Sequence, residues 1–382
     1  MRFVWIFLIF LSQEVCATGV RVRLLTSQNS IHLTAEEFKI ISDSHHCLRA
    51  GVKIKSRAAE LVIKRISSGW GLFNVATRQL CEIESEKLKF QARAIAINHR
   101  SVPREIVLEP VSAKQGFDVI ADLDLEKYLI GVLSKEMPAS FPLEAFKAQA
   151  IASRSYAMKK IMSSASRNFD LESGVADQVY EYATGSARVL AAVQETRGLV
   201  LENQKGHLFS VYYHADCGGH TEEPSDVWGS NERNGTVADE SCPLEPRSSW
   251  SFVISKFELT ARLRVILQLG DAQILGIEEY ENSSSGRKKS LKFLLDDHTT
   301  RLISGQQLRN ILGYEKLKST LFAFNQGGSD FVFEGKGHGH GVGMCQWGAR
   351  HLALGGFEYP RILKHYYPLA KLAEIPAERK LE

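Results

Sequence analysis

The sequence predicts an α+β protein, in which a β-rich N-terminal module is followed by a mixed α/β domain. Between residues 20 and 119, runs such as "VRVRLL" and "LKFQARAIAI" place apolar residues at every second position, the period of half-buried β-strands. Between residues 122 and 162 the apolar period lengthens to that of helices, and strand-like runs return at "GLVLEN" and "HLFSVYYHAD". With 44% hydrophobic and 24% charged residues, the 382-residue chain has the composition of a globular protein.

The first residues have the pattern of a signal peptide. Arg2 precedes an apolar run at 3–11, and "VCA" at 15–17 matches a small-residue cleavage site. The run is too short to span a membrane, and no later apolar segment reaches the roughly 20 residues that a transmembrane helix needs. We therefore expect cleavage after residue 17, no transmembrane segment, and export to the periplasm or cell envelope.

The mature chain is expected to have two main parts. Residues 18–115 form the β-rich N-terminal module, and residues 116–382 form the mixed domain, with a mixed subdomain inside it at 250–333. The formal net charge of +3 is too small to indicate binding to nucleic acid, but the N-terminal module has an excess of Lys and Arg. This excess fits either an anionic polymer such as a cell envelope or a solvated strand surface.

Two helices are predicted on either side of a short joint. The first spans about 126–135, and the second begins between Ser140 and Pro142, where a serine cap and an early proline suit a first turn. The second helix carries an apolar stripe at helical spacing, made of Leu143, Phe146, Ala150, Ala157 and Ile161. Arg154 falls inside this stripe, where a cation needs a partner.

The later part of the chain predicts three more helices. An amphipathic helix is expected at 255–269. A short helix at 344–354 ends before Gly355 and Gly356, and a last helix begins at Pro360.

Glu136 lies at the joint between the two central helices, in "SKEMPASFP". Apolar neighbours would raise the pKa of such a carboxyl by desolvation, whereas a nearby helix start would lower it. Taken alone, this position favours a structural role over an acid or base role. The sequence contains no G-x-S-x-G elbow, no P-loop and no H-E-x-x-H pattern that would indicate other chemistry.

The stretch "GKGHGHGVGMCQWGAR" at 335–350 alternates glycine with His338 and His340. Such a run is retained where the backbone turns tightly or approaches another group closely. The two imidazoles suit metal ligands, acid/base groups or hydrogen-bond donors, and the competing interpretation is a tight turn with incidental polar side chains.

The cysteines near "HADCGGH" allow two interpretations. His214, Cys217, His220 and Cys242 are residue types that bind zinc, and three of them lie within seven residues. Their spacing matches no usual zinc finger, and an oxidising compartment favours a disulfide between Cys217 and Cys242. We therefore predict this disulfide, no metal and no cofactor, with Cys345 as a free thiol.

Several segments together resemble the SpoIID/LytB family, the stage II sporulation protein D-like proteins of bacterial cell walls. The resemblance depends on "LEKYLIGVLSKEMPASFPLEAFKAQAIASRSYAM", "DQVYEY", "AAVQETRGLVL", "VYYHADCGGHTEEPSDVWG", "ISGQQLRNILGYEKLKSTLF" and "GKGHGHGVGMCQWGARHLALGGFEYPRILKHYYP". They follow the family's order and cover roughly residues 106–368. The basic N-terminal module lies mostly outside this match.

The resemblance implies a lytic transglycosylase, which cuts peptidoglycan glycan strands between N-acetylmuramic acid and N-acetylglucosamine and leaves 1,6-anhydro ends. It implies that Glu136, in the "EMP" segment, is the catalytic acid, and it favours strands without stem peptides. His340 and Gln346 are then expected to contact the sugar, with Arg154, Gln178 and Tyr180 as further candidates for substrate binding. For Arg154 an internal ion pair, and for Tyr180 simple packing, are the alternatives.

The sequence also departs from the family pattern. Some members have a His/Cys metal cluster before the Gln-Val-Tyr segment, but here the stretch is "NFDLESGVADQVY", so no zinc is carried over. Cys345 stands where serine is common in the family.

Two other functions stay open at this stage. Since the family includes amidase enhancers, the first alternative is a wall-binding protein that breaks no bond and activates a cell-wall amidase as its partner. The second is a zinc-dependent hydrolase built on His214, Cys217 and His220.

Overall fold

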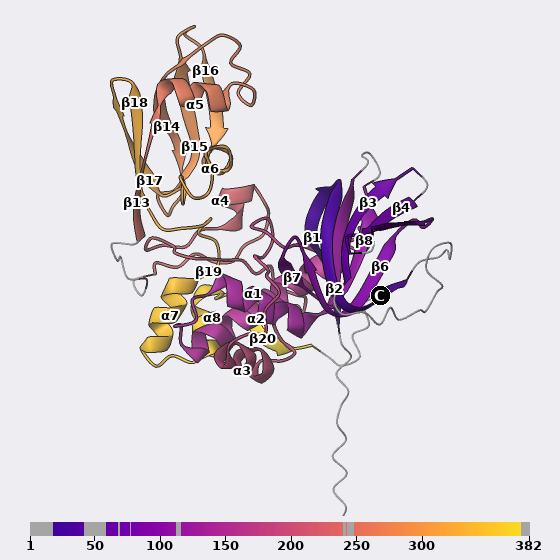
Figure 1. Ribbon diagram of the computed structural model, residues 1–382. Coiled ribbons are helices and arrows are strands. Elements are labelled where there is room, and N and C mark those ends of the chain that lie inside the picture. The colour runs from indigo at the N-terminus through magenta and orange to yellow at the C-terminus, as the bar shows by residue number, and fades with distance from the viewer. Residues whose placement is uncertain are drawn as a thin grey trace, which may run out of the picture. The chain divides into compact units, whose positions relative to one another are not determined.

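The computed structural model describes residues 18–41, 59–67, 69–76, 78–111, 116–239, 242 and 248–375 (Figure 1). The predicted signal peptide lies outside the described residues. The chain divides into two compact units, one formed by Met1–Lys127 with Glu374–Glu382 and the other by Tyr128–Ala373. Helices and strands are both abundant and the first unit is β-rich, which confirms the predicted α+β class.

The first unit is built on one antiparallel sheet. Its strands follow the spatial order β1-β9-β8-β6-β2-β3-β4-β5, and β7 pairs with β6. Their bounds are β1 Gly19–Gln28, β2 Ser30–Ile41, β3 Ala59–Ile66, β4 Gly69–Asn74, β5 Gln79–Ile83, β6 Leu88–Ile97, β7 Arg100–Val102, β8 Glu105–Pro110 and β9 Phe117–Asp124. Alternate side chains of these strands form a core that includes Trp70, Phe90 and Phe117, as their period of two requires.

The boundary between the units falls inside the first helix rather than at residues 115–116. Strand β9 belongs to the first unit because it pairs with both β1 and β8. Helix α1 (Leu125–Glu136) follows directly, and the backbone N–H groups of Glu126 and Lys127 both donate to Asp124. This carboxylate therefore satisfies two of the unpaired donors at the helix start.

The second unit surrounds the long helix α2 (Leu143–Ser163) with short elements. Helices α7 and α8 are coloured yellow in Figure 1, because they come from the C-terminal part of the chain. The other bounds are β10 Leu171–Glu172, α3 Ala187–Glu195, β11 Leu199–Glu202, β12 Tyr213–His214, α4 Pro224–Trp228, β19 Met344–Cys345, α7 Gln346–Leu354, α8 Tyr359–Tyr366 and β20 Lys371–Glu374. The pairs β12–β19 and β11–β20 tie middle segments of the chain to its C-terminal part.

Helix α2 is buried over much more than the predicted stripe. Thirteen of its 21 residues are buried, because α3, β11, α7 and α8 contact it on several sides. Its many alanines allow these neighbours to approach closely. The N-cap is Pro142, whose side chain makes no capping hydrogen bond, so the expected serine cap is wrong.

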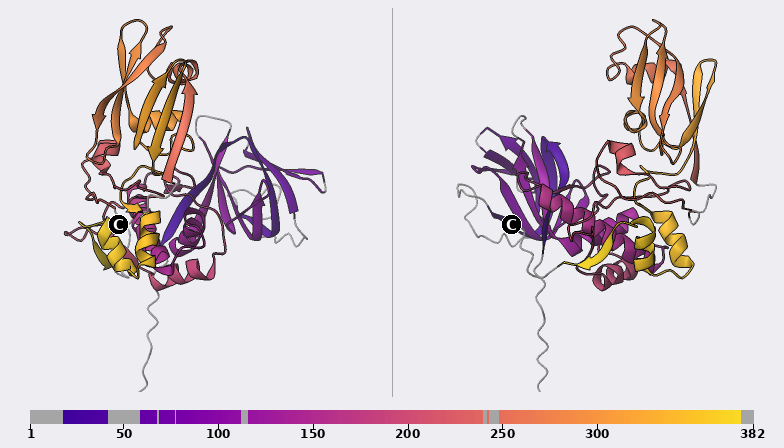
Figure 2. Two further views of the ribbon diagram at one scale, coloured as in Figure 1. Left: turned by 90° about the vertical axis from the view of Figure 1, so that its left-hand side faces the viewer. Right: turned by 180° about the vertical axis from the view of Figure 1, so that it is seen from behind.

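Residues 249–336 form a mixed region with its own hydrophobic core. Figure 2 shows its strands, drawn in orange, in two sheets with the orders β13-β18-β17 and β14-β15-β16. Their bounds are β13 Ser249–Ser255, α5 Lys256–Leu263, β14 Ile274–Asn282, β15 Lys288–Leu295, β16 Thr300–Ser304, α6 Gly305–Leu312, β17 Phe322–Gly327 and β18 Asp330–Lys336. Helix α5 is shorter than expected because turns follow it, and these turns bury Leu267 and Leu269 in the same core.

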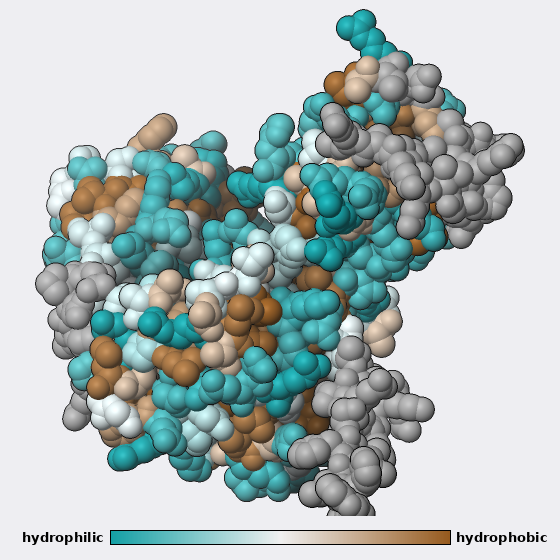
Figure 3. All heavy atoms as spheres, turned by 60° about the horizontal axis from the view of Figure 1, so that its bottom comes forward, coloured by the Kyte–Doolittle hydropathy of each residue, from teal (hydrophilic) through white to brown (hydrophobic). Residues whose placement is uncertain are grey.

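The surface of the described residues mixes polar and apolar groups. On the face drawn in Figure 3, hydrophobic residues lie in small groups between hydrophilic ones. Such scattered apolar side chains are normal on globular proteins. No helix within the described ranges is long and apolar enough to cross a membrane.

We expect Phe293→Ala to lower the free energy of unfolding by about 3–5 kcal/mol, because the buried ring leaves a cavity in the core of the 249–336 region. Phe257→Ala is the matched control, since that ring on α5 is 79% exposed and its loss costs less than about 0.5 kcal/mol. Urea denaturation checks both variants. Equal losses in the two variants would contradict this assignment of the core.

Candidate active site

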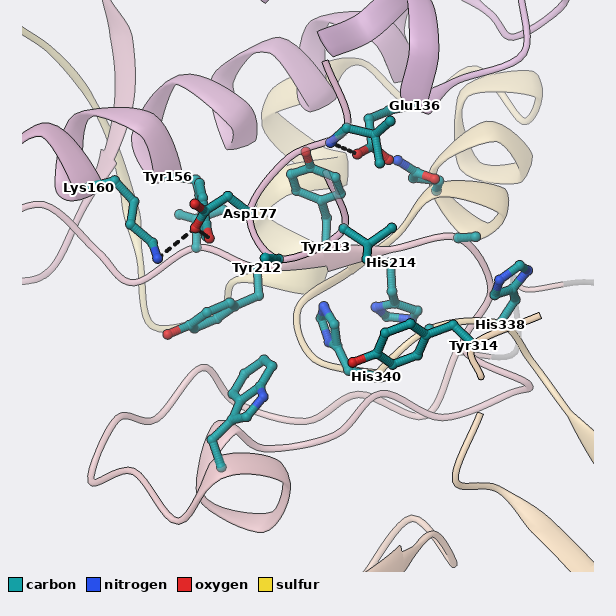
Figure 4. A pocket seen from close by; sticks show the side chains of 18 of the residues that line it. Glu136, Tyr156, Lys160, Asp177, Tyr212, Tyr213, His214, Tyr314, His338 and His340 are labelled. Atoms are coloured by element: carbon teal, nitrogen blue, oxygen red, sulfur yellow. Dashed lines mark hydrogen bonds and ion pairs between the residues drawn. The ribbon is translucent and has the colours of Figure 1, made fainter. Parts of the chain in front are cut away.

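A cavity of about 770 Å³ lies in the second unit. It is lined by residues from the end of α1, the C-terminal half of α2, the 175–179 segment, β12, α4, the 306–315 segment and the glycine-rich loop at 335–343. Figure 4 shows Glu136 and Asp177 at separate places along this cavity, with His214, His338 and His340 on its other side.

Glu136 is the last residue of α1, so the helix end presents its half-buried carboxyl to the cavity. The backbone N–H of Val179 donates to its Oε1 at 2.8 Å, the dashed line beside Glu136 in Figure 4. Burial raises the pKa of Glu136, and the hydrogen bonds from Val179 and the Gln346 side chain offset this only in part. The site thus favours a protonated carboxyl over a wider pH range than water does.

Asp177 lines the same cavity but has the opposite character. Its Oδ1 accepts from the Tyr156 hydroxyl at 2.7 Å and pairs with Lys160 Nζ at 2.7 Å, while Oδ2 accepts from the Glu172 N–H at 2.9 Å. Burial alone would raise the pKa of Asp177, but these three donors lower it below its usual value. Asp177 is therefore an ionised, fully engaged carboxylate.

Two residues of the glycine-rich loop, His338 and His340, line the cavity together with His214 of β12. The N–H of Val342 donates to His340 Nδ1 at 3.0 Å, which leaves the ring proton on Nε2. Burial, reinforced by the charges of Arg309 and Arg287, lowers the pKa of His340 to about 3. This low pKa favours a neutral His340 ring, which acts as a hydrogen-bonding group near neutral pH.

The glycines of this loop allow it to pack on the protein's own backbone. At Gly339, with φ of +116°, a Cβ would lie 2.6 Å from the Cβ of His214. At Gly343, with φ of +71°, a Cβ would overlap the carbonyl oxygen of Tyr212. The glycines therefore allow the loop backbone to lie directly against strand β12 and the residue before it. This contact directs His338 and His340 into the cavity.

Aromatic side chains form one wall of the cavity. The rings of Tyr212 and Trp228 lie 4.7 Å apart between centroids, and Trp228 lies 5.0 Å from the ring of His340. Trp228 is 43% exposed, so its ring is available to a ligand. Neither aromatic residue was predicted as part of the site, although "VYYHAD" and "DVW" contain them, because no local pattern shows that they share a wall.

Three of the predicted substrate-binding residues lie beneath the cavity rather than on its wall. Arg154 is fully buried, and it donates to the carbonyl oxygens of Leu199 at 3.0 Å and Val193 at 3.5 Å. Its partners therefore include backbone carbonyls, and it holds α3 and β11 against α2.

Gln178 is 1% exposed, accepts from the Tyr128 hydroxyl and donates to the Tyr213 hydroxyl, each at 3.0 Å. Tyr180 stacks on Tyr128 with ring centroids 5.3 Å apart. The "QVY" segment therefore contributes to the site through the backbone N–H of Val179, which donates to Glu136. Of the predicted substrate-binding residues, His340 and Gln346 line the cavity.

The predicted disulfide is absent, because Cys217 and Cys242 are both free thiols in the structure. They lie in a buried group with Cys345, whose Sγ is 3.6 Å from that of Cys242. The group of described residues whose donor atoms lie close enough to share a metal ion contains neither His214 nor His220, the two histidines of the zinc alternative.

Comparisons with known proteins agree with the resemblance in the motifs. A family model described as "Stage II sporulation protein" matches residues 113–202, and a model for a domain of unknown function matches 243–343. An uncharacterised protein of Brachyspira hyodysenteriae is 34% identical over 65% of the chain and 66% of its own length. The amidase enhancer of Bacillus subtilis is 28% identical over 63% of the chain, and its stage II sporulation protein D is 27% identical over 77% of the chain.

These findings define a stage II sporulation protein D-like protein, in which the first model covers residues 113–202 and the second covers most of the mixed region. The chain belongs to the SpoIID/LytB family. It spans 39% of the length of the amidase enhancer and 87% of that of the sporulation protein.

We expect Gly343→Ala to destabilise the protein by about 2–5 kcal/mol, because the new methyl group would meet the Tyr212 carbonyl in a left-handed conformation. Gly356→Ala is the control, since Gly356 also has a positive φ of +84° but has open space around it, and the change costs about 1–2 kcal/mol. Thermal unfolding of both variants measures the difference. A Gly343→Ala protein as stable as the control would show that this contact is unimportant.

Proposed function

We propose that the protein acts on the bacterial cell wall as a lytic transglycosylase, which cleaves the bond between N-acetylmuramic acid and N-acetylglucosamine in peptidoglycan. The observation that carries this proposal is Glu136, a half-buried carboxyl with a raised pKa on the wall of a large cavity. The second buried carboxylate on that wall, Asp177, is held ionised by its three donors. The family membership supports a function at the cell wall.

A single carboxyl suffices for this reaction. Ordinary glycosidases need a second carboxylate as nucleophile or as activator of water. In a lytic transglycosylase, protonated Glu136 gives its proton to the glycosidic oxygen as the bond to C1 of the muramic acid breaks. The 6-hydroxyl of the same sugar then bonds to C1 and returns its proton to Glu136, so a 1,6-anhydro end forms without consumption of water.

The remaining residues of the cavity suit a sugar chain. The volume lies within the range of about 300–1,000 Å³ typical of ligand sites, so it admits a short segment of a strand. The exposed ring of Trp228 and the ring of Tyr212 offer a surface for the apolar face of a pyranose. Neutral His340 adds a hydrogen-bonding group, and Gln346 orients Glu136. Strands that lack stem peptides are the proposed substrate, because the family resemblance favours them.

A second candidate function is enhancement of a cell-wall amidase by binding to the wall. It is favoured by the 28% identical relative named as an amidase enhancer. In that case the amidase is the protein's partner, and Glu136 contributes only to the structure of the helix joint. Export to the periplasm or cell envelope is part of both proposals.

The decisive test incubates purified protein with glycan strands, both intact and stripped of peptides, and analyses the fragments by mass spectrometry. We expect fragments lighter by one water than hydrolysis products, at a rate at least about 100-fold lower for Glu136→Gln, which cannot donate the proton. Glu315→Gln is the matched control, because Glu315 is an exposed carboxylate on the same cavity. No release by wild type, together with amidase stimulation that Glu136→Gln retains, would establish the enhancer function instead.

The rate of strand cleavage should fall as pH rises through the raised pKa of Glu136, because the general acid must be protonated.

The stability of the folded protein should depend on pH for the same reason. Since the folded-state pKa lies above the ordinary 4.5, the native protein binds more protons between these two values and loses stability as pH rises through them. Glu136→Gln lacks this loss of stability. Its free energy of unfolding relative to wild type should therefore increase as pH rises over the same range, as measured by denaturation at several pH values. A constant difference would argue against a raised pKa.

A further inference from the structure

A buried cluster of three cysteines and one aspartate lies apart from the cavity. One donor atom from each of Cys217, Asp239, Cys242 and Cys345 lies within 4.8 Å of all the others, and each residue is at most 3% exposed. We propose that this cluster, defined here as the thiol cluster, binds one Zn²⁺ with a structural role. The proposal is independent of the transglycosylase activity.

The spacing of the donors suits a tetrahedral zinc ion. Sulfurs about 2.3 Å from such an ion lie about 3.8 Å from one another. The sulfurs of Cys242 and Cys345 are 3.6 Å apart, and Oδ2 of Asp239 is 3.5 Å from the sulfur of Cys217. A disulfide requires sulfurs about 2.05 Å apart, so it would remove two of the four donors from this arrangement.

Backbone N–H groups surround the sulfurs in the way that metal thiolates require. Gly219 donates to the sulfur of Cys217 at 3.3 Å, while Cys217 and Gly348 both donate to the sulfur of Cys345 at 3.3 Å. Cys345 is also the N-cap of α7, where the helix dipole favours negative charge. These donors stabilise thiolates, and such outer hydrogen bonds orient metal ligands.

The carboxylate of the thiol cluster is oriented as well. The Tyr366 hydroxyl donates to Asp239 Oδ2 at 2.7 Å, and His365 Nε2 lies 3.6 Å from Oδ1. Oδ1 itself is buried without a hydrogen-bond partner among the described residues. A carboxylate that is fully buried and incompletely satisfied is costly unless it meets a cation.

The charge of the site also calls for a divalent cation. Binding follows Zn²⁺ + 3 R–SH → Zn(S–R)₃⁻ + 3 H⁺, and the aspartate brings the total charge of the site to −2. Arg287 is 2% exposed and donates to the carbonyl oxygens of Cys217 and His220. Its Nη1 has no hydrogen-bond partner among the described residues, and its positive charge acts on Cys217 and Cys345 as well as on Glu222.

The position of the thiol cluster indicates what the ion would do. The cluster joins the turn after β12, Asp239 and Cys242, and the start of α7. Its four residues are absent from the cavity wall, which is the closed arrangement of structural zinc sites. Gln346, next to Cys345, contacts Glu136, so the ion would hold the active site in place without touching the substrate.

The test measures zinc in the full chain, purified without chelator, by inductively coupled plasma mass spectrometry. We expect one Zn²⁺ per chain, and cobalt substitution should give the charge-transfer and d–d bands of a tetrahedral cobalt thiolate. Cys345→Ser and Cys242→Ser should bind zinc at least about 10-fold more weakly in competition with a chromophoric chelator. Cys81→Ser is the matched control, because Cys81 lies on β5, outside the thiol cluster, and it should keep full metal content.

Tyr366→Phe keeps the proposal testable if the serine variants fail to fold, because it removes only the hydroxyl that orients Asp239. Its zinc affinity should fall by about 10–100-fold while its circular dichroism spectrum is unchanged. Wild-type protein without zinc would overturn the proposal, as would a mass lower by two hydrogens that shows a disulfide within the thiol cluster. Strand cleavage is measured separately, so a metal-free but active enzyme would reject this inference alone.

Discussion

The candidate active site depends on the close contact between the glycine-rich loop and strand β12. Backbone hydrogen bonds between Asp216 and His338 run in both directions, at 3.0 and 2.8 Å, and β12 pairs with β19 just after the loop. Glycine at 339 and 343 is what allows the two backbones to approach this closely. One contact therefore aims two histidines into the cavity, places Gln346 beside Glu136 and brings Cys345 to Cys217.

The same packing sets the electrostatics of the cavity. Both carboxyls are partly removed from water, but Asp177 has three donors that compensate for the loss of hydration and Glu136 has fewer. Burial therefore has opposite net results, an ionised Asp177 and a Glu136 that retains its proton more readily. The neutral state of His340 has the same origin, because burial lowers its pKa and the nearby charges of Arg309 and Arg287 lower it further. This arrangement leaves Glu136 as the group best suited to transfer a proton.

Strand β12 and the turn after it contribute residues to both the cavity and the thiol cluster. His214 faces the cavity, whereas Cys217, three residues further, belongs to the thiol cluster on the other side of the same turn. The buried helix α2 supports both sides, since its neighbours include β11 and α7. Because Cys345 and Gln346 are adjacent in the chain, an ion bound in the thiol cluster would also help to fix the position of Gln346 in the active site.

The sequence by itself determined the α+β class, the helix at about 126–135 that leads to Glu136 and the need for glycines before α7, because apolar period and backbone freedom are local properties. Only the tertiary structure decided that Arg154, Gln178 and Tyr180 are buried supports rather than parts of the cavity wall. It also decided that the thiols stay separate in a group that includes Cys345, which is 128 residues from Cys217 along the chain. Residues so far apart meet through packing around α2 and the pairing of β12 with β19, and no local pattern encodes that proximity.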